Sequence, residues 1–221
     1  MLMKPFVFMP RMRTIGRVHT ALWQARQQFR HPTTYVEYQH CQPFEDGYDN
    51  VTFLYEKARQ HFLSTDCDTF ISVEDDIIIP PNGFNLLADT VADVAMGIYC
   101  LRQKPNYRWN AFVSVKEDEG MSITEHDVHE VTTLCRNRGV KQVAGVGLGF
   151  TMIKRHVLET IKFERRGNAC NDWYFSVDCQ TNCFTQVANF DVLCGHFVTQ
   201  ASRFILWPDY LADNLHRKEQ L

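Results

Sequence analysis

The stretch Asp68-Thr69-Phe70-Ile71-Ser72-Val73-Glu74-Asp75-Asp76-Ile77 joins an apolar segment directly to three consecutive acids. Residues 69–73 are predicted to form a buried strand, because three of them are large and apolar and most of them favour strands. Burying an unpaired carboxylate is costly, so an acidic run faces water, a cation or a helix N-terminus. Ligands of open α/β sheets bind beyond the carboxyl ends of the strands, and carboxylates placed there suit a hard divalent cation. The stretch therefore predicts either a cation site or a solvated turn ahead of Pro80-Pro81-Asn82-Gly83.

Strand and helix patterns alternate on both sides of this stretch. The predicted strands are 7–8, 34–38, 94–101, 112–115, 142–146 and 187–192, and the predicted helices are 14–29, 51–63, 84–91, 125–136 and 155–161. Such alternation is typical of a parallel sheet covered by helices. We expect one mixed α/β domain over residues 1–221, with a mostly parallel sheet flanked by helices. A nucleotide-binding half would span about 1–101 and an acceptor-binding half about 102–210.

The composition is that of an ordinary globular protein, with 45% hydrophobic and 22% charged residues. The net charge of −3 gives no overall attraction to nucleic acid, so such a partner would need a local basic patch. No stretch reaches the roughly 18 consecutive apolar residues of a membrane-spanning helix, and the N-terminus lacks a signal-peptide cleavage site. Eight scattered cysteines in a chain able to form a core favour reduced thiols. The expected location is the cytoplasm of a bacterial or virus-infected cell.

The acidic strand and the prolines that follow it resemble the DxD segment of GT-A glycosyltransferases. The Glu-Asp-Asp spelling is similar to that of N-acetylglucosaminyltransferases with this fold. The resemblance implies that Asp76 binds a metal ion and that Glu74 and Asp75 contact the nucleotide-sugar donor. Glutamate in the first position departs from the more common aspartate.

Two further segments extend the resemblance on the donor side. Arg59, in the predicted helix 51–63, lies where family-2-type enzymes carry an arginine near the donor; a solvated basic face is the alternative. The segment Gly145-Val146-Gly147-Leu148-Gly149-Phe150 resembles the glycine-rich strand that lines the sugar pocket, which implies a donor contact at Gly147. A tight turn or phosphate loop is the alternative, although the spacing fits neither a P-loop nor a dinucleotide fingerprint. Glu37, near the end of the second strand, is a candidate contact for the base.

Two late segments complete the resemblance, which runs in order from about residue 5 to 200. Asn171-Asp172-Trp173 resembles the Glu-Asp-Trp segment that carries the catalytic base of inverting members, with Asn in place of Glu. Asp172 would then deprotonate the acceptor hydroxyl. Leu193-Cys194-Gly195-His196-Phe197 resembles a late Cys-Gly-His element, which implies that His196 completes the metal site.

The resemblance implies a metal-dependent hexosyltransferase that uses Mn²⁺ or Mg²⁺ and a UDP-sugar donor. Inverting transfer needs one catalytic carboxylate rather than a glycosidase pair, and retaining chemistry stays open. The acceptor could be a glycan, a lipid-linked sugar, a protein or a modified DNA base.

Two other functions are compatible with parts of the sequence. A metal-dependent nucleotidyltransferase would use a similar sheet but needs a glycine-rich phosphate loop after the first strand. Residues 11–16 there contain two arginines and a single glycine. A non-catalytic zinc-binding module would use the cluster Cys179, Cys183, Cys194 and His196, although one isolated Cys-x-x-x-Cys pair is a weak zinc signal.

Overall fold

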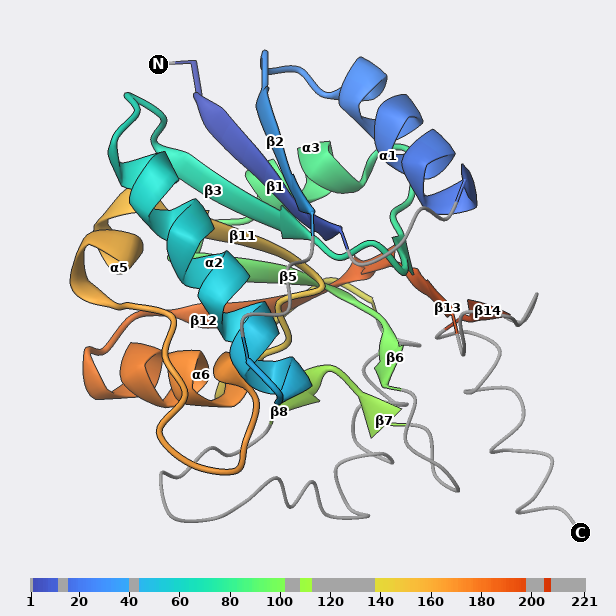
Figure 1. Cartoon of the computed structure of the whole chain (residues 1–221). Coiled ribbons are helices and arrows are strands. Elements are labelled where there is room, and N and C mark those ends of the chain that lie inside the picture. The colour runs from blue at the N-terminus through green and yellow to red at the C-terminus, as the bar shows by residue number, and fades with distance from the viewer. Residues whose placement is uncertain are drawn as a thin grey trace, which may run out of the picture.

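The computed structural model of this chain is built on a seven-stranded sheet with the strand order β2-β1-β3-β11-β5-β12-β9 (Figure 1). The structure describes residues 2–11, 16–39, 44–101, 108–112, 138–197 and 205–207. The strands of this sheet are β1 Pro5–Arg11, β2 Thr34–Gln39, β3 Thr69–Val73, β5 Val94–Ile98, β9 Val140–Gln142, β11 Phe150–Lys154 and β12 Gln186–Leu193. Strands β2, β1, β3, β5 and β12 run in one direction, and β11 and β9 run antiparallel to them.

Helices cover both faces of the sheet (Figure 1). They are α1 Gly16–Gln28, α2 Gly47–Leu63, α3 Gly83–Ala88, α5 Arg155–Thr160 and α6 Asn171–Thr181. Apolar residues of α2, α5 and α6 pack in one core cluster, and those of α1 and α3 pack in the other. Every residue of β3 and of β5 is buried, which is typical of parallel strands covered on both faces.

Short strand pairs extend the structure beyond the carboxyl end of β3. Strand β4 (Ile77–Ile78) pairs antiparallel with β13 (Gly195–Phe197), which also pairs with β14 (Ile205–Leu206). Strand β6 (Cys100–Leu101) pairs with β7 (Arg108–Trp109), and β8 (Ala111–Phe112) pairs with β10 (Gly145–Val146). The β4–β13 pair brings a late part of the chain beside the acids that follow β3.

The expected fold class, a single mixed α/β domain with a mostly parallel sheet flanked by helices, is confirmed. The strand predicted over 69–73 has the same bounds in the structure. Helix α6 is not predicted by the sequence pattern, because seven of its eleven residues are buried and no continuous polar stripe marks an exposed face. The helix predicted at 125–136 lies outside the described residues, and the division into two functional halves stays a prediction.

Candidate functional site

The three acids form a tight turn at the carboxyl end of β3. The Glu74 N–H donates to the Gly149 carbonyl at 2.8 Å, and the Ile77 N–H donates to the Glu74 carbonyl at 3.1 Å. Asp75 and Asp76 are both buried, with 4% of each residue exposed. A solvated turn, which was the alternative, would leave these carboxylates exposed to water, so their burial argues against it. Carboxylates are rarely buried without compensating groups.

His196 on β13 lies next to Asp76. Its Nε2 atom is 3.6 Å from Asp76 Oδ1, and both side chains are buried. Its Nδ1 atom is 2.5 Å from the Cys100 carbonyl oxygen, which can only accept, so Nδ1 carries a proton. In the neutral ring Nε2 therefore presents a lone pair toward Asp76. Nε2 is buried and makes no hydrogen bond within the described part of the chain.

Tyr99 contacts His196 of this pair and is not among the site residues that the sequence predicts. Its ring meets the His196 ring edge-on, with centroids 5.3 Å apart. Its hydroxyl accepts the Gly149 N–H at 3.0 Å. Burial raises the pKa of Tyr99 well above its usual value, and the charges of Glu74, Asp172 and Asp76 add to this shift. These three predicted carboxylates therefore lie near enough to Tyr99 for their charges to act on its hydroxyl.

Gly147 packs against Tyr99. A Cβ atom at Gly147 would lie 2.6 Å from the Tyr99 hydroxyl oxygen, and one at Gly149 would lie 2.8 Å from the same atom. Glycine is needed where another group approaches the backbone this closely. The predicted donor role of Gly147 is untested, but the close approach to Tyr99 supplies a structural reason for the residue.

Asp172 lies in the first turn of α6, where a carboxylate interacts favourably with the helix N-terminus. Its Oδ1 accepts the Trp173 N–H at 2.9 Å, and the Cys170 thiol also hydrogen-bonds to it. Burial raises the pKa of Asp172 despite these bonds, which act in the opposite direction. A carboxylate with a raised pKa is a better proton acceptor, as a general base requires.

Tyr55 on α2 contacts the acidic turn through the side chain of Glu74. Its hydroxyl lies 3.1 Å from Glu74 Oε1 and 3.1 Å from the Leu148 carbonyl oxygen, so it donates to either acceptor. Burial, together with the Glu74 charge, raises the pKa of Tyr55 well above its usual value. Tyr55 therefore joins the acidic turn to the glycine-rich segment, and Tyr99 joins the glycine-rich segment to His196.

The structure does not bring Arg59 or Glu37 to the acidic turn. Arg59 is buried between α2 and α5, where its Nε donates to the Leu158 carbonyl at 2.6 Å and Nη1 pairs with Glu56 at 2.9 Å. Glu37 lies near the end of β2, where it pairs with Arg11 at 2.5 Å and accepts the Tyr35 hydroxyl at 3.0 Å. The donor roles of Arg59 and Glu37 remain predictions.

No group of three or more His, Cys, Asp or Glu side chains able to hold a metal ion occurs among the described residues. Cys179 and Cys194 are buried and Cys183 is exposed, so the cluster proposed for zinc does not converge in this part of the chain. Asp76 and His196 form a two-ligand pair instead. Metal binding at that pair would need further ligands from a substrate or from water.

Comparisons with known proteins agree on the fold. No family model and no curated protein matches this chain. Among solved structures, A197 from STIV is similar with a TM-score of 0.62 and 23% identity, over 94% of this chain and 91% of that chain. The inositol-1-phosphate CTP transferase from T. maritima is similar with a TM-score of 0.50 and 10% identity, over 98% and 96%. S. aureus TarS 1–349 has a TM-score of 0.49 and 13% identity, over 86% and 58%.

These likenesses show that the chain shares its fold with other proteins, one of which is a CTP transferase. None of the described helices is long and apolar enough to cross a membrane.

Proposed function

We propose that this protein is a metal-dependent glycosyltransferase that moves a sugar from a nucleotide-sugar, a UDP-sugar, to a hydroxyl acceptor. The observation that carries the proposal is the buried pair of His196 Nε2 and Asp76 Oδ1, 3.6 Å apart at the carboxyl end of β3. Substrates of open α/β sheets bind at this edge. The resemblance of the acidic turn and the late His segment to GT-A glycosyltransferases supports the same assignment.

The chemistry of the pair fits one divalent cation, Mn²⁺ or Mg²⁺. Neighbouring ligands of an octahedral cation lie at about 90° to each other, so two ligands about 2.1 Å from Mn²⁺ or Mg²⁺ are about 3.0 Å apart. The separation of 3.6 Å is about 0.6 Å larger, so the two side chains would have to move together by that amount to share the cation. A bound cation would offset the negative charge that develops on the departing nucleoside diphosphate. With two protein ligands, coordination positions remain for diphosphate oxygens and water.

The remaining predicted residues would act on the donor and the acceptor. Glu74 and Asp75 belong to the turn that holds Asp76, so they are suited to contact the donor ribose or a metal-bound water. Asp172, with its raised pKa, would take the proton of the acceptor hydroxyl, which gives inverting transfer. Gly147 would line the sugar pocket beside Tyr99. Glu37 would contact the base. Arg59 would contact the donor, although its side chain is held between α2 and α5 in this structure.

A nucleotidyltransferase is the second candidate, and the fold shared with a CTP transferase favours it. Such an enzyme would join a nucleoside triphosphate to a sugar phosphate and release pyrophosphate. The glycosyltransferase would instead release a nucleoside diphosphate from a nucleotide-sugar. The two candidates therefore differ in the products that appear.

The products released from a panel of substrates with Mn²⁺ test the proposal. UDP-sugars, other nucleotide-sugars, and CTP or UTP with sugar phosphates would be incubated with the protein, and the nucleotides analysed by chromatography. We expect UDP from a UDP-sugar, with loss of turnover in Asp76→Asn and no change in Asp191→Asn, an exposed control carboxylate on β12. Pyrophosphate release from a triphosphate, without cleavage of any nucleotide-sugar, would assign the second candidate instead.

A further inference from the structure

Two adjoining pockets beside α1 form a surface that we call the α1 groove. Their volumes are about 440 and 430 Å³, which lie in the range typical of small-molecule sites, and Trp23 and Arg26 line both. The first is also lined by Gln27, His31 and Thr33, and the second by Tyr35 and Glu37. None of Glu74, Asp75, Asp76, Asp172 or His196 lines either pocket.

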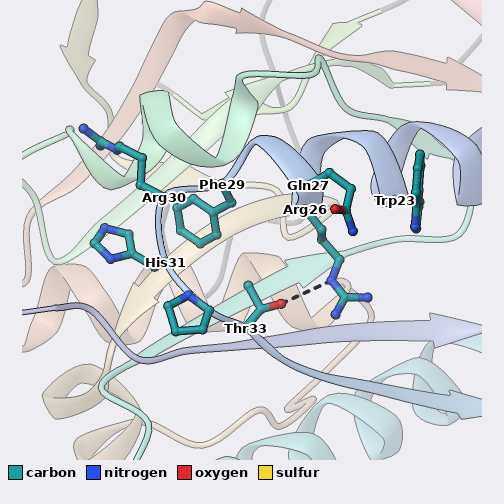
Figure 2. A pocket seen from close by; sticks show the side chains of 8 residues that line it. Trp23, Arg26, Gln27, Phe29, Arg30, His31 and Thr33 are labelled. Atoms are coloured by element: carbon teal, nitrogen blue, oxygen red, sulfur yellow. Dashed lines mark hydrogen bonds between the residues drawn. The ribbon is translucent and has the colours of Figure 1, made fainter.

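Arg26 is held in place, and no charged group from the described part of the chain pairs with it: its contacts there are with a hydroxyl and an aromatic ring. Its Nε donates to the Thr33 hydroxyl at 3.2 Å (Figure 2), and its guanidinium lies 4.5 Å from the centre of the Tyr35 ring. Its neighbours differ, since Arg11 pairs with Glu37 and Arg30 pairs with Asp89. Within the described residues no carboxylate pairs with Arg26, which is half-buried. A fixed, partly desolvated guanidinium of this kind is suited to bind an anion through its terminal N–H groups.

The charges around Arg26 favour an anionic ligand. Helix α1 contains Arg17 and Arg26 but no acidic residue, whereas the whole chain has a net charge of −3. Glu37 is the carboxylate in the second pocket, and its ion pair with Arg11 at 2.5 Å offsets its charge. The groove is therefore a local positive region on an acidic protein.

Trp23 adds a flat apolar surface beside this charge. It is 61% exposed and precedes Arg26 by three positions on α1, so the two side chains are neighbours on the helix surface. An exposed indole ring stacks against the face of a sugar or a base. We propose that the α1 groove binds a phosphate ester of a ring compound, with Arg26 on the phosphate and Trp23 against the ring. None of the acids of the acidic turn lines the groove, and its argument does not rest on the proposed function, although the groove includes Glu37, for which that function proposes a contact with the donor base.

Calorimetric titration in the presence of EDTA tests this site. EDTA removes divalent cations, so metal-dependent binding of a donor at the acidic turn does not contribute to the signal. The probes are inorganic phosphate, glucose 1-phosphate and UMP. We expect saturable binding of at least one ester, more tightly than inorganic phosphate. Arg26→Gln should weaken ester binding about tenfold or more, and Trp23→Ala should weaken ester binding but leave phosphate binding unchanged. Arg17→Gln, on the same helix but outside both pockets, is the matched control and should bind as the wild type does.

The two esters distinguish the ligand sources, because tighter binding of UMP assigns a nucleotide and tighter binding of glucose 1-phosphate assigns a sugar phosphate. If Arg26→Gln does not fold, as judged by circular dichroism, Arg26→Lys keeps the charge but loses the fork geometry and should still weaken ester binding. The proposal is overturned if the wild type binds neither ester. Equal weakening in Arg17→Gln, or wild-type affinity in the folded Arg26 variant, would overturn it as well.

Discussion

The ring of Tyr99 meets the ring of His196 edge-on, with centroids 5.3 Å apart and an interplanar angle of 81°. The Tyr99 backbone is itself fixed by the buried Asn110, whose Oδ1 accepts the Tyr99 N–H at 2.9 Å. On the other side of His196, its Nδ1 atom donates to the Cys100 carbonyl. These contacts hold the imidazole so that Nε2 faces Asp76, as a ligand in a preorganised site requires.

Tyr99→Phe should destabilise the protein while leaving His196 in place. The variant removes the acceptor of the buried Gly149 N–H, and an unsatisfied buried donor costs about 1–3 kcal/mol. Tyr99→Leu also removes the ring contact and should mix the His196 tautomers. Urea unfolding measures the first effect, and ¹⁵N NMR of the imidazole measures the second. An unchanged free energy of unfolding in Tyr99→Phe would show that the hydroxyl has no structural role.

Gly147→Ala should destabilise the protein by about 1–3 kcal/mol, because its Cβ would overlap the Tyr99 hydroxyl. Combining it with Tyr99→Phe should cost less than the sum of the two single substitutions, since the Tyr99 oxygen is the atom that the new methyl meets most closely. Gly16→Ala is the matched control, because nothing lies within 4 Å of the place that a Cβ atom would take there, and it should be neutral or stabilising by up to about 1 kcal/mol. Thermal unfolding of the four variants compares them. Equal stability of Gly147→Ala and Gly16→Ala would contradict the packing described.

Asp172→Asn should stabilise the protein near pH 7 but not near pH 4. Burial raises the pKa of Asp172 above its usual 3.8, so the folded state favours the protonated form. The stability that this group contributes is fully present below 3.8 and is lost as the pH rises through the raised pKa. Asparagine stays neutral, and its side-chain oxygen can still accept the Trp173 N–H. Urea midpoints at about pH 7 and about pH 4 measure the difference.

The exposed Asp191→Asn is the control for this comparison and should show no such pH dependence. A stability difference between wild type and Asp172→Asn that is the same at both pH values would argue against a raised pKa of the partly buried Asp172. Loss of turnover in the same variant, with donor binding unchanged, is expected from its proposed role as base.

The local sequence pattern is sufficient to predict an element when that pattern alone determines where the element begins and ends. The strand 69–73 is predicted with its observed ends, because five buried residues are followed directly by three acids. The position of these acids at the carboxyl end of a parallel strand follows from the fold class. Helix α6 cannot be predicted in this way, since burial of Trp173, Phe175 and Val177 around it removes the one-sided apolar period.

Contacts between distant segments are harder to foresee. Tyr99 lies within a predicted strand, and its place in the site depends on Gly147 and Gly149, about 50 positions later in the chain. The glycines at alternating positions 145, 147 and 149 are the available signal, because glycine repeated on one side of a strand indicates a close approach. Arg59 is the opposite case, because it is predicted as a donor contact but bonds to α5 instead. Sequence alone does not reveal that this face of its helix packs on α5.

Binding of Mn²⁺ in the presence of UDP, followed by electron paramagnetic resonance, tests the central claim that Asp76 and His196 share one cation. Wild type and Asp191→Asn should bind one ion with equal affinity, whereas Asp76→Asn and His196→Ala should each bind about tenfold more weakly or worse. Circular dichroism would confirm that all four proteins are folded. Wild-type Mn²⁺ affinity in the folded Asp76→Asn and His196→Ala variants would contradict the claim.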